Sequence, residues 1–156
     1  MKKINLSIVL TFAFMSMLNL ACEEAMDKNP VFQKGQLAPA EYFTGNAWVT
    51  GLVDNDSVFT TAAGRVFFEA GARSNWHSHP SGQILIVTAG VGYHQIKGEP
   101  IKIIRKGDVV KCPPNIVHWH GASKDRSMTH IYIVPNTENG IVKWMEKVTD
   151  EQYSKL

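Results

Sequence analysis

The stretch that decides the fold runs from residue 71 to residue 83 and reads Gly-Ala-Arg-Ser-Asn-Trp-His-Ser-His-Pro-Ser-Gly-Gln. His77 and His79 are separated by one residue, and in a β-strand such a pair points to the same face. The Pro-Ser-Gly sequence that follows predicts a turn, so that Gln83 can begin the next strand close to the two imidazoles. Two convergent imidazoles make half of a metal site.

Short β-rich runs recur on both sides of this stretch, and turn residues separate them. We expect strands over residues 47–53, 65–69, 83–88, 91–96, 101–104, 109–111, 128–134 and 142–148. Helical turns are expected only near residues 39–42 and from Thr149 onward, where the threonine hydroxyl can cap the turn. This spacing predicts an all-β barrel or sandwich. His118 lies 35 residues beyond Gln83, and a barrel is needed to bring it back to the first two histidines.

Two spaced patterns resemble the two motifs of the cupin family. The first is Gly71, five residues, His77-Ser78-His79, three residues, Gln83, six residues and Gly90; the second is Gly107, five residues, Pro113-Pro114-Asn115, two residues and His118. The family more often has Glu at the position of Gln83, and often Gly at that of Asn115 and Asn at that of Ala122. The resemblance implies a double-stranded β-helix (jelly-roll) barrel that covers nearly the whole mature domain. It also implies one divalent metal with the ligands His77, His79, Gln83 and His118.

The glutamine has a chemical consequence. Three neutral imidazoles and a neutral amide leave the charge of the ion uncompensated, whereas a glutamate would cancel one unit. The ion should therefore be a stronger Lewis acid and should favour an anionic ligand. Nitrogen and oxygen donors suit manganese, iron, cobalt, nickel or zinc, and ligand softness alone does not choose among them.

Longer segments are similar to the small bacterial cupins that include manganese-dependent (R)-selective hydroxynitrile lyases, relatives of which are often annotated alongside carboxymuconolactone decarboxylases. These segments are residues 71–83, 85–90, 118–121, 128–130 and 144–153. The resemblance implies manganese and a lyase that cleaves a cyanohydrin into an aldehyde and cyanide. It also implies a role in proton transfer for His130. His120 is a second candidate because it lies two residues after His118, whereas His94 is a weaker one.

Other functions are compatible with the same motifs. A cupin that processes uronates or other sugars would need basic groups, and only Arg65, Arg73 and Lys111 lie near the motifs. A metal-dependent dioxygenase and a non-catalytic envelope protein that binds sugars are further alternatives. Arg73 is expected to have a structural role. The aromatic candidates for the pocket wall are Trp76, Trp119 and Tyr93, with plain core packing as the alternative, favoured for at least one of the two tryptophans.

The N-terminus has the layout of a secretory signal over residues 1–22, with Lys2 and Lys3 before an apolar run. The Ala-Cys pair that ends it favours lipidation of Cys22, with ordinary cleavage near Ala21 as the alternative. We expect a polar tether over residues 23–36, a cupin domain over residues 37–156, and an exported protein that is periplasmic or anchored as a lipoprotein.

Charge and cysteine content narrow the possible partners. Without Lys2 and Lys3 the chain has 14 basic and 14 acidic residues and no basic stripe, so no nucleic-acid partner is expected. The expected partner is instead a small-molecule substrate.

Cys112 is expected to be a buried small apolar residue rather than a reactive thiol. Residues 84–87 are apolar on both faces, which favours a homodimer or homotetramer that covers the outer face.

Overall fold

The computed structural model describes residues 31–156. The expected signal peptide, Cys22 and most of the expected tether lie outside the described residues, so those assignments stay predictions. Within the described part of the chain, no helix is long and apolar enough to cross a membrane.

The described residues form short antiparallel strands and two brief helical turns. The strands are β1 (Gln36–Leu37), β2 (Phe43–Thr44), β3 (Ala47–Val53), β4 (Thr61–Phe68), β5 (Arg73–Ser74), β6 (His77–Ser78), β7 (Gln83–Ile96), β8 (Lys102–Arg105), β9 (Val109–Cys112), β10 (His118–Ala122), β11 (Met128–Pro135) and β12 (Lys143–Trp144). The helical turns are η1 (Thr137–Asn139) and α2 (Asp150–Tyr153).

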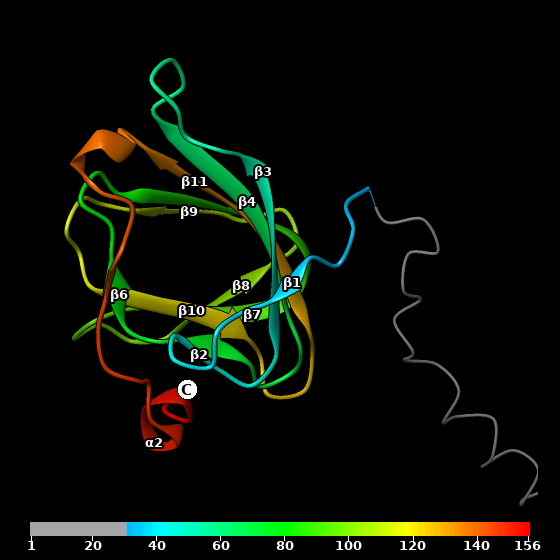
Figure 1. Cartoon of the computed structure of the whole chain (residues 1–156). Coiled ribbons are helices and arrows are strands. Elements are labelled where there is room, and N and C mark those ends of the chain that lie inside the picture. Colours follow the sequence, from blue (N-terminus) through cyan, green and yellow to red (C-terminus); the bar gives the residue numbers. More distant parts are fainter. Residues whose placement is uncertain (1–30) are drawn as a thin grey trace, which may run out of the picture. The chain divides into compact units, whose positions relative to one another are not determined.

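Strand β7 joins the two sheets of the barrel. Its first half pairs with β9 and β11, and its second half pairs with β8 and β10. The longest path through the sheet has the order β1-β3-β4-β11-β7-β10-β5-β2, and β6 pairs with β10 and β12. In Figure 1, β3, β4, β9 and β11 lie across the barrel from β2, β8 and β10. The curled all-β fold confirms the predicted jelly-roll barrel.

Several predicted elements differ from the observed ones in extent. The runs predicted over 83–88 and 91–96 form the single strand β7, which bends at Gly90, where φ is +74°. The final strand is shorter than predicted because only Lys143–Trp144 pairs with β6. The predicted helical turn near residues 39–42 is a hydrogen-bonded turn in which Tyr42 N–H donates to the Pro39 carbonyl. The predicted cap is confirmed, since Thr149 forms a capping box with Gln152.

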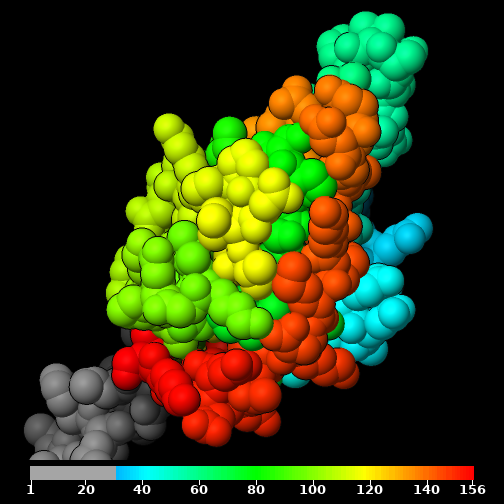
Figure 2. Space-filling view, turned by 90° about the vertical axis from the view of Figure 1, so that its left-hand side faces the viewer, coloured from blue at the N-terminus to red at the C-terminus, as the bar shows by residue number. Residues whose placement is uncertain are grey.

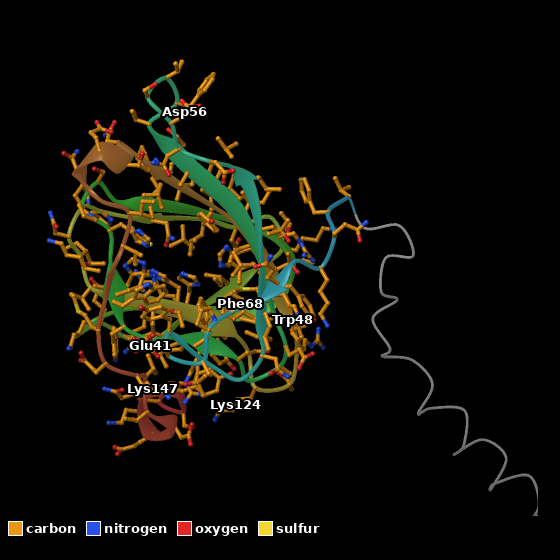
Figure 3. All side chains as sticks on the ribbon, in the orientation of Figure 1. Glu41, Trp48, Asp56, Phe68, Lys124 and Lys147 are labelled. Carbon is orange, nitrogen blue, oxygen red and sulfur yellow. The ribbon has the colours of Figure 1, made fainter. Side chains whose placement is uncertain are left out.

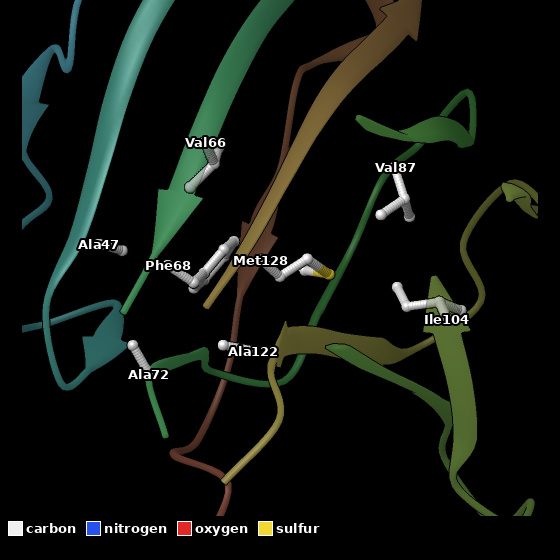
Figure 4. Packing of buried hydrophobic residues seen from close by; sticks show 8 residues of the cluster. All are labelled: Ala47, Val66, Phe68, Ala72, Val87, Ile104, Ala122 and Met128. Atoms are coloured by element: carbon white, nitrogen blue, oxygen red, sulfur yellow. The ribbon is translucent and has the colours of Figure 1, made fainter. Parts of the chain in front are cut away.

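Alternation along the strands places the core inside the barrel. Phe68 and Met128 face each other across β4 and β11 and are both fully buried, and Figure 4 shows them within the main cluster. Burial of each such side chain contributes about 1.5–3 kcal/mol. Trp48 lies on the outer side of the wall (Figure 3), where the Lys34 ammonium sits 3.5 Å from its ring centroid.

The C-terminal segment is held against the barrel by a buried arginine. Arg73 donates to the Val148 carbonyl at 3.0 Å and forms an ion pair with Asp150 at 2.6 Å. Its guanidinium also lies over the Tyr153 ring. Figure 2 shows the segment, in orange to red, running over the surface between the cyan N-terminal strands and the green and yellow strands. The predicted structural role of Arg73 is the tethering of this segment.

The bend at Gly90 supplies a test of the fold. A Cβ at Gly90 would overlap the Ser127 carbonyl, whereas a Cβ at Gly98 would meet no atom within 4 Å, although its φ is also positive. We expect Gly98→Ala to lower the free energy of unfolding by about 1–2 kcal/mol, from backbone strain alone. Gly90→Ala should cost about 3 kcal/mol or more, because overpacking adds to that strain. Urea unfolding of the two variants measures the difference, and equal losses would contradict the proposed contact.

Candidate metal centre and cavity

Adjacent strands bring three of the predicted ligands together. His77 on β6 pairs in register with His118 on β10, and His79 follows directly after β6. One ring nitrogen from each of the three histidines lies within 4.8 Å of the other two. All three side chains are buried. The grouping is the one that the spacing predicted, although β6 itself ends at Ser78.

Backbone carbonyls fix the orientation of these three rings. Each Nδ1 lies within hydrogen-bond distance of a carbonyl oxygen: His77 to Asn75 at 2.9 Å, His79 to Ile141 at 2.6 Å and His118 to Ile116 at 3.0 Å. A carbonyl only accepts, so Nδ1 carries the proton and Nε2 keeps its lone pair. Hydrogen bonds of this kind set the tautomer and direction of metal-binding histidines.

Gln83 completes the predicted set of four. It begins β7 opposite Cys112 of β9, and its Oε1 lies 3.3 Å from Nε2 of His118. Among the described residues, Nε2 of His79 is buried without a hydrogen-bond partner. An imidazole nitrogen left in this state is costly unless a ligand occupies it. The donor set therefore fits a divalent transition metal.

The electrostatics of the site keep its histidines neutral. Burial, together with the neighbouring His118, holds the pKa of His77 well below its usual value. Burial also lowers the pKa of His118 to about 4 and lowers that of His79. Metal binding needs the deprotonated imidazole, so these rings are ready to bind at neutral pH without first losing a proton.

A cavity of about 220 Å³ opens beside the histidines. Its polar end contains His77, His79, Gln83, His120 and His130. The rest of its wall is apolar or aromatic and consists of Pro39, Tyr42, Phe43, Val49, Val66, Tyr132, Val134, Ile141, Val142 and Trp144. In residues 31–156, no lysine or arginine lines the cavity.

His120 and His130 face this cavity together. Their ring centroids are 4.7 Å apart in an edge-on arrangement, and the centroid of His120 is 5.1 Å from that of His77. Burial lowers the pKa of His130 to about 4, and burial with His130 as neighbour holds the pKa of His120 well below its usual value. Within the described residues, both ring nitrogens of His130 and Nδ1 of His120 have no hydrogen-bond partner.

The aromatic residues predicted to line the pocket are elsewhere. Trp76, Trp119 and Tyr93 pack with Val148 and Tyr153 in a separate hydrophobic cluster, so the prediction of a pocket wall was wrong and the alternative of core packing holds for all three. The reason is strand alternation: Trp119 lies between His118 and His120 on β10 and therefore points to the opposite face.

The aromatic wall comes from segments that the motifs do not include. The ring of Trp144 stacks on Tyr42 at 4.8 Å, and its centroid lies 5.0 Å from that of His77. Tyr132 could have been found from the sequence, since it shares a strand face with His130. Trp144 carries no such signal, because it reaches the site through the two-residue pairing of β12 with β6.

Within residues 31–156, Cys112 forms no disulfide; it is buried, as predicted, and burial raises its pKa to about 12. Sequence reasoning missed its neighbour. Nε2 of His94 lies 3.4 Å from its sulfur, and burial with the adjacent His118 lowers the pKa of His94 to about 3.

Comparisons with known proteins agree with this architecture. Residues 64–134 match the cupin domain family. The chain is 45% identical over 117 residues to a protein named (R)-mandelonitrile lyase from Granulicella tundricola, a match that covers 75% of this chain and 89% of the relative.

Solved structures show the same fold. A cupin-like protein from Thermotoga maritima is 49% identical, with a TM-score of 0.79 over 81% of this chain and 96% of that one. A Klebsiella pneumoniae protein with a double-stranded β-helix domain shares the fold at 15% identity, with a TM-score of 0.58 over 77% of this chain and 100% of that one. The chain belongs to the cupin family.

Proposed function

We propose that this cupin is a metal-dependent lyase that cleaves a small aryl cyanohydrin into an aldehyde and hydrogen cyanide. The observation that carries the proposal is a fully buried His130 whose two ring nitrogens lack partners among the described residues, at the wall of a cavity that also holds the three-histidine group. The 45% identity to a protein named (R)-mandelonitrile lyase supports the same reaction.

The proposed metal ligands are His77, His79, Gln83 and His118, with manganese as the expected ion and iron, cobalt, nickel or zinc as alternatives. When bound, the ion supplies a Lewis acid that lowers the pKa of a substrate hydroxyl. The protein's own contribution is orientation: the carbonyls of Asn75, Ile141 and Ile116 hold the three imidazoles with Nε2 free.

His130 is the proposed general base. Its low pKa keeps the imidazole neutral, so one ring nitrogen can accept the hydroxyl proton of the cyanohydrin. The oxygen then forms the aldehyde carbonyl, and the bond to the nitrile carbon breaks with its electron pair leaving as cyanide. The proton held on His130 balances the reaction when it is returned to cyanide.

His120 is the proposed second member of the proton pathway. Its ring lies edge-on to that of His130, and its Nδ1 has no partner in the described chain. The backbone N–H of His120 donates to Ser74 Oγ at 3.2 Å, which fixes this part of β10 beside the site. A neutral imidazole in this place can receive the proton from His130 and deliver it to the leaving cyanide.

The cavity wall favours an apolar substrate. Tyr42, Phe43 and Trp144 offer aromatic surface for a phenyl ring, and aromatic pairs contribute about 0.5–1.5 kcal/mol beyond the area that they bury. A uronate would need a basic side chain beside the metal to hold its carboxylate, and in the described residues neither Arg65, Arg73 nor Lys111 lines the cavity.

We also retain the proposal of a homodimer or homotetramer. Ile84 and Ile86 of β7 point away from the barrel and pair in register with Ile133 and Ile131 of β11. These four side chains form an apolar strip on the outer face of the sheet. Export and lipidation of Cys22 likewise stay proposals.

The first test replaces the proposed base. Manganese-loaded wild-type protein should release benzaldehyde from (R)-mandelonitrile well above the metal-free control. His130→Gln should lower kcat by about 10²–10⁴ because general base catalysis is lost. The manganese content of His130→Gln should equal that of the wild type. Absence of benzaldehyde from the loaded wild type would remove the lyase proposal.

The pH profile of kcat gives a second test. The lowered pKa of His130 means that solvent protonates its imidazole only at acid pH, so we expect kcat to stay level from neutral pH downward and to fall only as the pH approaches about 4. A solvent-exposed histidine would instead give an acid limb near about 6.5. Metal content is measured at each pH, because His118 titrates in the same range. A limb near neutrality at full metal occupancy would argue against His130.

The third test adds the charge that the family usually has. Gln83→Glu should bind manganese more tightly, because a carboxylate cancels one unit of the ion's charge. It should also lower kcat, on the order of tenfold, because the ion then polarises the substrate oxygen less. Equilibrium dialysis and the benzaldehyde assay measure the two effects. Weaker manganese binding by Gln83→Glu would contradict the proposed role of Gln83 as a ligand.

A further inference from the structure

A second group of potential metal ligands lies behind the first. His94, Cys112 and His118 each offer one ligand atom, and these atoms lie within 4.8 Å of one another. All three side chains are buried, with exposed fractions of 3%, 3% and 0%. Neither His94 nor Cys112 lines the cavity, so the proposed lyase reaction leaves both unused.

The fold aims these side chains at one place. Cys112 on β9 pairs in register with Gln83 on β7, and His94 further along β7 pairs with His120 on β10. Residues paired across antiparallel strands project to the same face. Cys112 and His94 therefore share the inner face of the barrel with Gln83 and His120, and both come within reach of His118.

The separation of the two new donors suits a metal. Sγ of Cys112 is 3.4 Å from Nε2 of His94. Bonds of about 2.3 Å to sulfur and 2.0–2.1 Å to nitrogen at a tetrahedral angle place these atoms about 3.5 Å apart. The existing distance is thus close to one edge of a coordination tetrahedron.

His118 can serve only one group at a time. Its Nδ1 is taken by the Ile116 carbonyl, so Nε2 is the nitrogen left for either set of ligands. Gln83 Oε1 lies 3.3 Å from that same nitrogen and offers an oxygen donor to both.

We propose that His94, Cys112 and His118 form a site for a thiophilic ion such as cadmium or copper(I). This site competes for His118 with the metal site proposed above, which consists of His77, His79, Gln83 and His118. Binding of the ion displaces one proton from the Cys112 thiol to solvent and forms a metal–thiolate bond, so no oxidant or reductant is required. A thiolate ligand favours such soft ions over manganese, for which nitrogen and oxygen donors are sufficient.

Occupation of the second site should inhibit the proposed lyase reaction, because one ion takes the place of the other. A thiophilic ion at the second site withdraws His118 from His77 and His79 and leaves the first site incomplete. The competition rests on the metal site proposed above, but occupation of the thiolate site does not.

The test uses cadmium as the probe on the full chain. Cys22→Ser is introduced in every sample, so that Cys112 is the only thiol that remains. Manganese-loaded protein is titrated with Cd²⁺, and the cadmium–thiolate charge-transfer band is followed in the ultraviolet. Free manganese is followed by electron paramagnetic resonance. We expect the band to saturate at one cadmium per chain, with one manganese released for each cadmium bound.

Two variants make the outcome decisive. Cys112→Ser should lose the band and release its manganese only at higher cadmium concentrations, and its manganese content before the titration shows that the variant is folded. His94→Asn keeps the thiol and should shift the band to higher cadmium concentrations by about tenfold or more, as expected for the loss of a ligand contact. Manganese release without a thiolate band in the Cys22→Ser chain would overturn the proposal. So would an unchanged titration of His94→Asn.

A failure of the proposed function can be distinguished from a failure of the second metal site. If the protein takes up no manganese, the cadmium–thiolate band and its loss in Cys112→Ser still test the second site. If manganese binds and benzaldehyde is not released, the competition is still read from the manganese signal.

Discussion

Three hydrogen bonds from imidazole Nδ1 to backbone carbonyls are the constraint on which the candidate site depends. Each bond assigns the proton to Nδ1 and turns Nε2 toward the same point. Histidine rings without such bonds would not be held in one direction. The three carbonyls come from different stretches of the chain: Asn75, Ile116 and Ile141. The direction of the side chains is therefore a property of the assembled barrel, and the apolar core around Phe68 and Met128 sustains it.

Because side chains alternate between the two faces of a strand, polar and aromatic residues are buried in two separate regions. The histidines and Gln83 point into the site. The adjacent residues Trp76 and Trp119 point away from it and pack with the C-terminal helical turn. The same arrangement crowds six histidines inside the barrel, where burial lowers the pKa of each imidazole, and neighbouring histidines lower the pKa of His77 and His120 further. A neutral cluster of this kind can bind cations and accept protons, but it offers no fixed charge to an anionic substrate.

The sequence predicted those features of the fold and the site that depend on residue spacing within the two motifs. The spacing of His77, His79 and Gln83, with His118 after the second motif, resembles the cupin motifs, and that resemblance implied the barrel in which the three histidines lie close together. The wall of the cavity was not predictable in this way. Trp144 and the Ile141 carbonyl reach the site through tertiary packing, with no periodic pattern around them. Trp119 does not line the cavity because it lies between two inward-facing histidines on β10 and therefore points to the opposite face.

The bond from His79 to the Ile141 carbonyl makes the histidine centre depend on a segment outside both motifs. These residues lie 62 positions apart, and the acceptor belongs to a segment that follows the last long strand. The imidazole is held in this tautomer and direction only while that segment is docked against the barrel. A shortened chain that lacks Ile141 would keep every histidine of the site and still lose the carbonyl that orients one of them.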